Sequence, residues 1–205
     1  MNCFCVKSIR SGLLVGLVLF VAGCSTNSSV ENQGPETEST AATLVEGKSP
    51  SEASKEMMLA AKDALFTKLS GRLKETMTSQ GPGAAIAVCQ KEAPAIAKAV
   101  SKEQGLQIGR TGVRLRNPGN VAPAWADELV REKIDTPTFV TLDNGHAAAL
   151  LPIKLQAQCL MCHGPKEQIA PVIQEQLTKL YPGDQATGFK EGELRGWFWI
   201  ELPRS

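Results

Sequence analysis

The sequence predicts an α+β domain, in which helices flank an antiparallel sheet and a long helix comes first. Apolar residues recur at helical spacing over 52–80 and again over 84–101. Two segments of strand composition, 137–142 and 147–155, are separated by an Asn-Gly pair, which is typical of a hairpin turn. A terminal strand is predicted over 194–202. Helices followed by a hairpin and a last strand indicate the α+β class.

The remaining elements follow from local composition, in chain order. Pro94 lies inside the second helical pattern and should kink or break that helix, because proline lacks a backbone N–H. Residues 106–116 favour a strand and end at the turn cluster 117–120, whose two asparagines should fix the turn. A short helix is predicted over 123–133, and a further helix over 171–180.

A signal peptide is predicted over residues 1–23. Lys7 and Arg10 precede the apolar run 12–22, which is too short to span a bilayer comfortably. The run ends in Val-Ala-Gly before Cys24, a pattern that resembles a bacterial lipobox. Cleavage at that point would leave Cys24 as the diacylated N-terminus of a lipoprotein. The alternative is a plain secretory peptide with an incidental cysteine.

A flexible tether is predicted over residues 24–51. The segment is rich in Ser, Thr, Asn and Glu and has no aromatic residue, so it cannot bury enough surface to offset its conformational entropy. Ser25, rather than an aspartate, follows Cys24, which favours the periplasmic face of the outer membrane. The folded domain is then expected over 52–205. The formal net charge of +1 gives no reason to expect a nucleic-acid partner.

The cysteines of the folded region indicate a covalently bound haem. Three of the six cysteines lie in this region: Cys89, Cys159 and Cys162. The last two, followed by His163, form the motif C-x-x-C-H, which is the attachment signature of a c-type haem. Two intervening residues place the thiols at the spacing of two vinyl groups, and His163 can then bind the iron. One haem c is therefore the expected cofactor.

Two other readings of this motif compete with haem. A thioredoxin-like redox pair normally lies in a βαβ pattern with an aromatic or proline neighbour. A zinc site would need two further ligands, for which Cys89 and His146 are the candidates. The export signal, the following Gly164 and the presence of only two histidines all favour haem.

Cys89 is the candidate for the second axial ligand of the iron. It lies on the apolar face of the predicted helix over 84–101, where a free cysteine is commonly a small core residue. An unpaired thiol is a liability in an oxidising compartment unless a partner binds it, however, and ferric iron can bind thiolate. His146 follows Asp-Asn-Gly, a sequence typical of a turn, and is therefore expected on an exposed loop. Met161 lies beside His163 and cannot reach the other face of the haem.

Arginines of the predicted strand over 106–116 are candidates for haem propionate contacts, because guanidinium groups suit carboxylates. They are Arg110, Arg114 and Arg116, for which a structural or solvent-facing role is the alternative. Asp184 and Arg195 are expected to pair and to hold the closing loop.

Four segments together resemble one known family. They are AVCQKEAP around Cys89, LRNPGNVAPAW over 115–125, CLMCHG over 159–164, and LYPGDQATGFKEGELRGW over 180–197. In this order they resemble the bacterial PAS-like c-type haem proteins first described structurally in a cyanobacterium, the Tll-type haem-domain family. The resemblance implies a PAS-like sheet flanked by helices. It also implies axial ligation by His163 and Cys89.

Two functions are compatible with such a haem. The first is a redox or diatomic-gas sensor, which would need a separate signalling partner because the chain shows no output domain of its own. The second is a low-potential periplasmic electron carrier with a redox partner, since thiolate favours ferric iron. A peroxidase-like enzyme is disfavoured, because six-coordinate iron has no open position and no distal acid–base histidine is evident.

Overall fold

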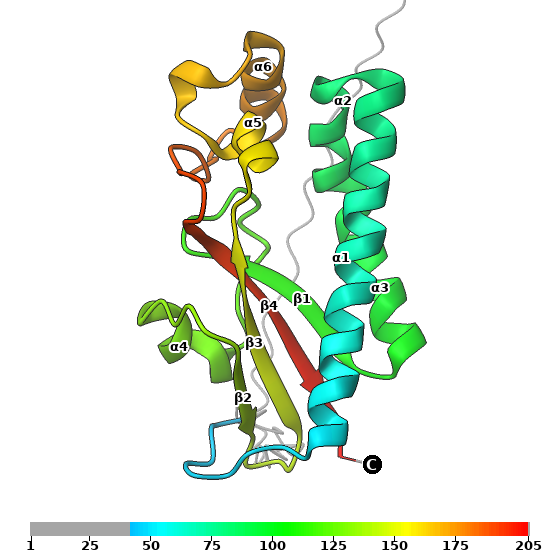
Figure 1. Ribbon diagram of the computed structural model, residues 1–205, viewed down its shortest axis with the longest axis vertical. Helices are drawn as coiled ribbons and strands as arrows, with labels where there is room; N and C mark the ends of the chain where they lie inside the picture. Colours follow the sequence, from blue (N-terminus) through cyan, green and yellow to red (C-terminus); the bar gives the residue numbers. More distant parts are fainter. Residues whose placement is uncertain (1–41, 205) are drawn as a thin grey trace, which may run out of the picture. The chain divides into compact units, whose positions relative to one another are not determined.

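The computed structural model describes residues 42–204, which form an α+β domain (Figure 1). The predicted signal peptide over 1–23, the predicted lipidation site Cys24 and most of the predicted tether lie outside the described residues. Within the described range, no helix is both long enough and apolar enough to cross a membrane.

The elements follow one another in the predicted order. The α-helices are α1 (Glu52–Gln80), α2 (Pro82–Ala87), α3 (Ala93–Gln104), α4 (Asp127–Arg131), α5 (Leu160–His163) and α6 (Pro171–Leu180). A π-helical segment, η1 (Val88–Glu92), separates α2 from α3. Short 3-10 turns are η2 (Ala124–Ala126), η3 (Ala157–Cys159) and η4 (Lys166–Gln168). The strands are β1 (Gln107–Gly112), β2 (Thr138–Thr141), β3 (Ala147–Lys154) and β4 (Leu194–Leu202).

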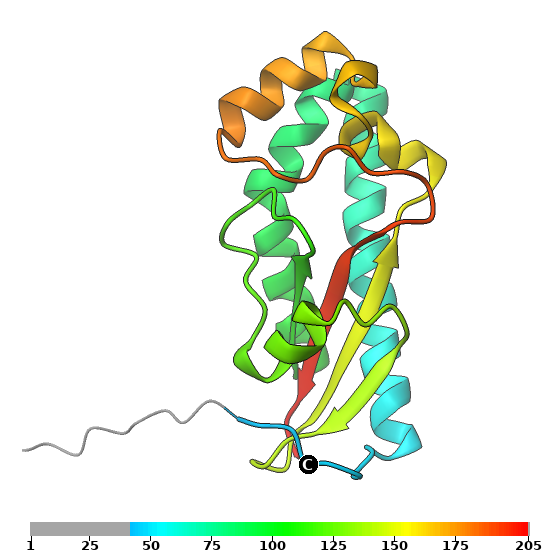
Figure 2. The same ribbon diagram turned by 90° about the vertical axis from the view of Figure 1, so that its left-hand side faces the viewer.

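The long first helix begins at a side-chain cap. The Ser51 hydroxyl accepts a hydrogen bond from the Ser54 backbone N–H at 3.1 Å, which satisfies one of the unpaired donors at the helix start. Met58, Ala61 and Leu65 are fully buried, at the spacing of one helical face. This face packs against the sheet, and the rest of α1 extends beyond it beside α2 (Figures 1 and 2).

The second predicted helix is interrupted before its proline. Pro94 occupies the first turn of α3, where a missing N–H costs little. The carbonyl of Gln90 nevertheless loses the donor that residue 94 would supply in a regular α-helix. The chain accommodates this with the π turn of η1, in which the Ala93 N–H donates to the Val88 carbonyl, five residues back. Cys89 lies in this turn.

The sheet has four antiparallel strands in the order β1-β4-β3-β2. β2 and β3 form the predicted hairpin, in which Gly145 adopts φ 82° and donates to the Leu142 carbonyl at 2.9 Å. β4 lies between β1 and β3 and pairs with both of them. The predicted fold class is confirmed: an α+β domain with a four-stranded antiparallel sheet, flanking helices and a long N-terminal helix.

Both faces of the sheet are covered. Along β4, Phe198 and Ile200 point to the face packed by α1 and α3, while Trp197 points to the opposite face. There Trp197 is fully buried beside Trp125 of η2. The Trp197 indole N–H donates to the Ile134 carbonyl at 2.6 Å, which fastens the segment around α4 to the sheet.

A further layer lies at the end of the sheet where β3 leads into α5 (Figure 1). α2 packs against α6 through a cluster that includes Ile86, Ile173 and Tyr181. A small neighbouring cluster, Leu155, Ala186 and Phe189, supports the start of α5. This end of the domain carries the sequence-predicted cysteines and His163.

The segment before α1 is bound to the opposite end of the sheet. Leu44 forms a β-bridge with Leu142, and the Val45 N–H donates to the Thr141 carbonyl at 2.9 Å. The Thr43 hydroxyl donates to the Asp143 carboxylate at 2.7 Å. Composition places the start of the domain at residue 52, whereas these residues of the predicted tether already contact the hairpin, because they complete the unpaired end of β2.

Candidate functional site

The predicted attachment residues lie on one short helical segment. Cys159 ends η3, and Cys162 and His163 lie in α5, which follows without a break. Gly164 ends the turn, and its N–H donates to the Leu160 carbonyl at 2.8 Å. A Cβ atom at this glycine would lie 2.6 Å from the Leu160 oxygen. Glycine is therefore required where the chain leaves the turn.

A backbone carbonyl fixes the orientation of the His163 ring. Nδ1 lies 2.7 Å from the Ala186 carbonyl oxygen, which can only accept, so Nδ1 carries the proton. Arg195 Nε lies 3.4 Å from the same nitrogen and cannot donate to it in this tautomer. The shorter contact, with the Ala186 carbonyl, therefore determines which ring nitrogen is protonated. The lone pair of His163 is thus on Nε2. Metal-binding histidines commonly donate their other ring N–H in this way.

The environment of His163 keeps the imidazole neutral. Burial is the main cause that lowers its pKa to about 3, and the nearby positive charges of Arg116 and Arg195 act in the same direction. Phe189 meets the ring edge-on, with centroids 6.4 Å apart and an interplanar angle of 81°. A neutral, firmly held imidazole is the form that binds a metal ion.

Cys89 approaches this turn from a different element. It lies half-buried in η1, and burial raises the pKa of its thiol, while Arg110, Arg116 and Arg195 oppose that rise. Burial is also the main cause that raises the pKa of the Cys162 thiol to about 11. Cys162 also packs against the α2–α6 cluster, which includes Ile86, three residues before Cys89 in the chain.

Arg116 links the loop that contains Asp184 and Ala186 to the predicted attachment turn, residues 159–164. Its side chain is 7% exposed, and its Nε donates to Asp184 Oδ2 at 3.1 Å. Nη2 donates to the Cys162 carbonyl at 2.6 Å and to the Ala186 carbonyl at 3.2 Å. Three of its donor interactions thus join the loop that orients His163 to the turn that carries it.

The predicted pair between Asp184 and Arg195 is wrong, because Asp184 binds Arg116 instead. Arg195 crosses over β1, where Gly112 has no side chain to obstruct it, and donates to the Arg114 carbonyl at 2.9 Å. The guanidinium of Arg114 lies 3.9 Å from the centre of the Phe189 ring. The guanidinium of Arg195 lies 5.6 Å from the same ring centre, so both arginines pack near Phe189, a role that their spacing in the sequence does not reveal.

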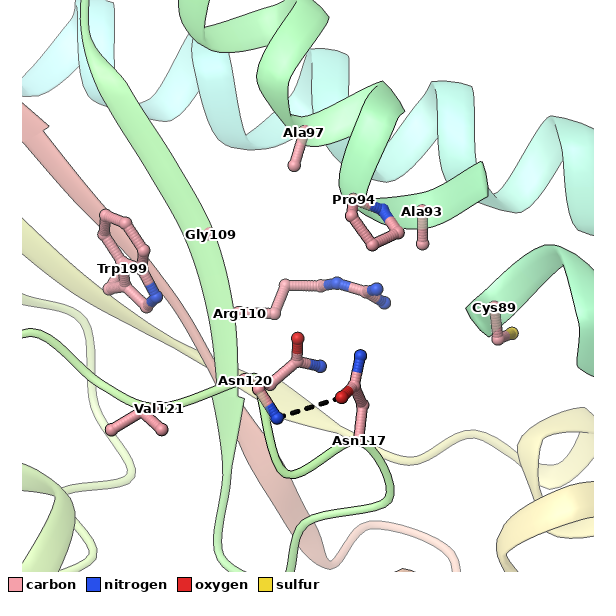
Figure 3. Close-up of a pocket in the computed structure, with 11 residues that line it drawn as sticks. Cys89, Ala93, Pro94, Ala97, Gly109, Arg110, Asn117, Asn120, Val121 and Trp199 are labelled. Carbon is pink, nitrogen blue, oxygen red and sulfur yellow. Dashed lines mark hydrogen bonds between the residues drawn. The ribbon is translucent and has the colours of Figure 1, made fainter. Parts of the chain in front are cut away.

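Arg110 differs from the other two arginines predicted to contact a propionate. Its side chain extends from β1 across a cavity of about 100 Å³, towards the helical segment that carries Cys89 (Figure 3). It forms no hydrogen bond or ion pair with another residue between 42 and 204. Trp199 and Asn117 line the same cavity. Gly109 leaves room for the Trp199 ring, since a Cβ atom there would collide with the indole.

The zinc alternative is not supported by this geometry. His146 lies at the far end of β3 from α5, and eight strand residues span roughly 25 Å. It is half-buried rather than on an exposed loop, and its Nδ1 lies 2.7 Å from Glu201 Oε1. Across residues 42–204, no three His, Cys, Asp or Glu side chains gather closely enough to hold a metal ion.

Comparison with known proteins identifies the family to which the chain belongs. The sequence model of the family described as Tll0287-like matches residues 39–203. The chain belongs to the Tll0287-like family. Its fold is similar to the crystal structure of the cyanobacterial heme-protein Tll0287, with a TM-score of 0.56 and 25% sequence identity. That similarity covers 76% of this chain and 98% of the other. No curated protein matches the sequence.

Several contacts of this candidate site could not be predicted from the sequence. The Ala186 carbonyl is invisible to side-chain analysis, although it lies in the segment over 180–197 that carries the family resemblance. The buried Arg116–Asp184 pair joins residues far apart in the chain. Neither has a local pattern that points to it. The turn role of Asn117 is confirmed, since its Oδ1 accepts from the Gly119 N–H at 2.9 Å.

Proposed function

We propose that this protein is an exported c-type haem protein, joined to one haem through Cys159 and Cys162. His163 and Cys89 would be the axial ligands. The observation that carries the proposal is the His163 ring, which projects from a C-x-x-C-H turn with Nδ1 bound to the Ala186 carbonyl and the lone pair on Nε2. The cyanobacterial protein of similar fold is a heme-protein. Bound haem would supply an iron ion that cycles between the ferric and ferrous states.

The donor set fits this group. Each thiol of Cys159 and Cys162 can add across a vinyl double bond, with the sulfur bonding one carbon and the proton going to the other, so that no oxidant is consumed. The neutral imidazole of His163 binds iron in its resting form. Cys89 lies in the only segment of α2–η1–α3 whose helical hydrogen bonding is irregular.

The irregular segment favours a sensory role over a purely structural one. π turns occur preferentially at functional sites. η1 continues directly into α3, and α3 packs against β1, so a change at Cys89 has a continuous path to the sheet. We therefore infer that the protein senses redox state or a diatomic gas, and that an unidentified signalling protein reads the change. With both axial positions filled by the chain, we propose no enzymatic activity.

A low-potential electron carrier is the alternative. The attachment turn reaches the surface, since Met161 is 42% exposed between the two cysteines. A redox partner could therefore approach the haem edge directly, as electron transfer requires. Ligand exchange on reduction would make such transfer slow, and this difference separates the two roles.

The first experiment tests the cofactor and its ligands. The absorption spectrum of the denatured protein in alkaline pyridine should show haem with two saturated side chains. Cys89→Ser should move the ferric Soret band, whereas Ala87→Ser, a matched change two residues earlier, should not. An unchanged Soret band in the Cys89→Ser protein would rule out thiolate ligation. Purified protein without haem would rule out the whole assignment.

The second experiment separates sensor from carrier. Carbon monoxide is added to the ferrous protein while electron exchange with a small redox mediator is timed. The sensor proposal requires that CO binds and that exchange is slow. If CO does not bind and electron exchange is fast, the sensor proposal fails and the protein is an electron carrier.

We also propose that lipidated Cys24 tethers the protein to the periplasmic face of a bacterial outer membrane. Cys24→Ala should move the full-length protein from the membrane fraction to the soluble periplasmic fraction. Recovery of both forms in the membrane fraction would contradict lipid anchoring through this residue.

A further inference from the structure

The cavity beside Cys89 is lined by several hydrogen-bond donors, by the amide of Asn120, and by no carboxylate of the described residues. Arg110, Asn117 and Trp199 contribute N–H groups from β1, the turn that follows it and β4. Among the described residues that line it, none is acidic. The cavity of about 100 Å³ has room for a group the size of a carboxylate or a few water molecules.

Arg110 carries a positive charge into this cavity without a partner. Burial lowers its pKa, and no carboxylate between residues 42 and 204 pairs with it. An unpaired, partly desolvated guanidinium is costly, and buried arginines are normally paired. Arg116 shows the paired case nearby, since it binds Asp184 and two carbonyl groups. The contrast indicates that Arg110 is arranged for an anion that the chain itself does not provide.

Two neutral donors face the same space. The Trp199 Nε1–H is buried and has no hydrogen-bond partner in the described part of the chain, and the nitrogen side of its indole faces the cavity (Figure 3). The amide of Asn117 has a fixed orientation, because Oδ1 accepts from the Gly119 N–H. Its Nδ2 is therefore on the cavity side, as Figure 3 shows. Water can accept from some of these donors but does not neutralise Arg110.

We propose that this cavity binds one carboxylate or other small oxyanion, held by Arg110, the Trp199 indole N–H and the Asn117 amide. Such an anion has two possible sources. It is either a propionate of the haem, in which case the inference rests on the proposed function, or a free solute that the protein detects beside Cys89. The shared chemistry is a planar, multidentate acceptor opposite a guanidinium.

Acetate titration of the full-length protein tests the site directly. The probe is the ¹⁵N indole resonance of Trp199, assigned with Trp199→Phe, at constant ionic strength maintained with sodium chloride. A free-anion site gives a saturable shift. Arg110→Gln should weaken acetate binding about tenfold or more, because a charge-assisted hydrogen bond is lost. Arg131→Gln, at an exposed arginine of α4 outside the site, should leave it unchanged.

The same titration in Cys159→Ser/Cys162→Ser protein, which cannot attach haem covalently, identifies the source. Acetate binding only in this double variant means that a propionate fills the cavity of the loaded protein. Binding in both proteins means a free anion. A crystal structure of the purified protein gives an answer even if the double variant does not fold. An oxyanion or propionate oxygen bound to Arg110 supports the proposal, whereas a cavity that holds only water overturns it.

The outcome is separable from that of the proposed function. A purified protein that lacks haem yet binds acetate through Arg110 would refute the haem assignment and retain the anion site. A haem protein whose Trp199 resonance ignores acetate, and whose propionates lie away from Arg110, would do the reverse.

Discussion

At the scale of single residues, the most demanding interaction of the site is the buried pair between Arg116 and Asp184. Both side chains are less than one-tenth exposed. Loss of one partner leaves a charge buried without compensation. Since Arg116 also binds the carbonyl of Cys162, this pair couples the stability of the domain to the geometry of the attachment turn.

Asp184→Asn should therefore lower the free energy of unfolding by about 3 kcal/mol, because Arg116 stays charged and loses its counterion. Urea unfolding followed by circular dichroism measures the change. Asp135→Asn is the control, since Asp135 pairs with Lys154 on the surface and should contribute less than about 1 kcal/mol. Equal changes in the free energy of unfolding would show that the buried Arg116–Asp184 pair contributes no more than a surface pair.

A second residue-scale prediction concerns pH. The Thr43 hydroxyl bond lowers the pKa of the Asp143 carboxyl below its usual value. This stabilisation is complete above the unfolded pKa of about 3.9 and is lost as the pH falls through the lower folded pKa. Thr43→Val should raise the pKa of Asp143, and Thr43→Ser should preserve it. An NMR titration of the carboxyl carbon that finds the same pKa in all three proteins would contradict the assigned cause.

At the scale of elements, the π turn sets the direction of the Cys89 side chain. A π turn contains one residue more than the α-helix it interrupts, so removing a residue restores regular winding. Deleting the exposed Lys91 should rotate Cys89 by about 100° relative to α3. The ferric Soret band should then resemble that of Cys89→Ser, while Lys91→Ala keeps the native band. A native spectrum after the deletion would mean that η1 does not position Cys89.

Two glycines should respond in opposite ways to substitution. Gly109→Ala collides with the Trp199 indole and should destabilise the domain by about 1–3 kcal/mol. Gly71→Ala lies in α1 with open space around the new methyl group, and should stabilise by about 0.5–1 kcal/mol through helix propensity. Thermal unfolding midpoints that move in the same direction would contradict this reading of the close contact in the sheet.

The boundaries of several elements could be predicted because their signals are local. The helices over 52–80 and 171–180 and the strand over 194–202 agree with α1, α6 and β4. The π turn could not be predicted in form, since Pro94 indicates only that regular hydrogen bonding stops. The Asp184 pairing also failed, because a choice between Arg116 and Arg195 depends on which side chain reaches the loop in three dimensions.

At the scale of the whole described domain, the site and the N-terminal contact occupy opposite ends of the sheet. α2, η1, α5 and α6 gather where β3 leads into the attachment turn, and the hairpin between β2 and β3 lies at the other end (Figure 1). The sequence predicts which residues form the candidate site. It does not show this separation, because strand order and register are long-range properties.

The binding of residues 43–45 to the hairpin has a mechanical consequence. Tension applied from the N-terminal side enters the domain through the Thr43, Leu44 and Val45 contacts at the end of β2. That point of load lies about one strand length, roughly 25 Å, from the attachment turn. A pull on the N-terminal segment would first break these few hydrogen bonds to the hairpin, at the end of the sheet away from the turn that carries His163.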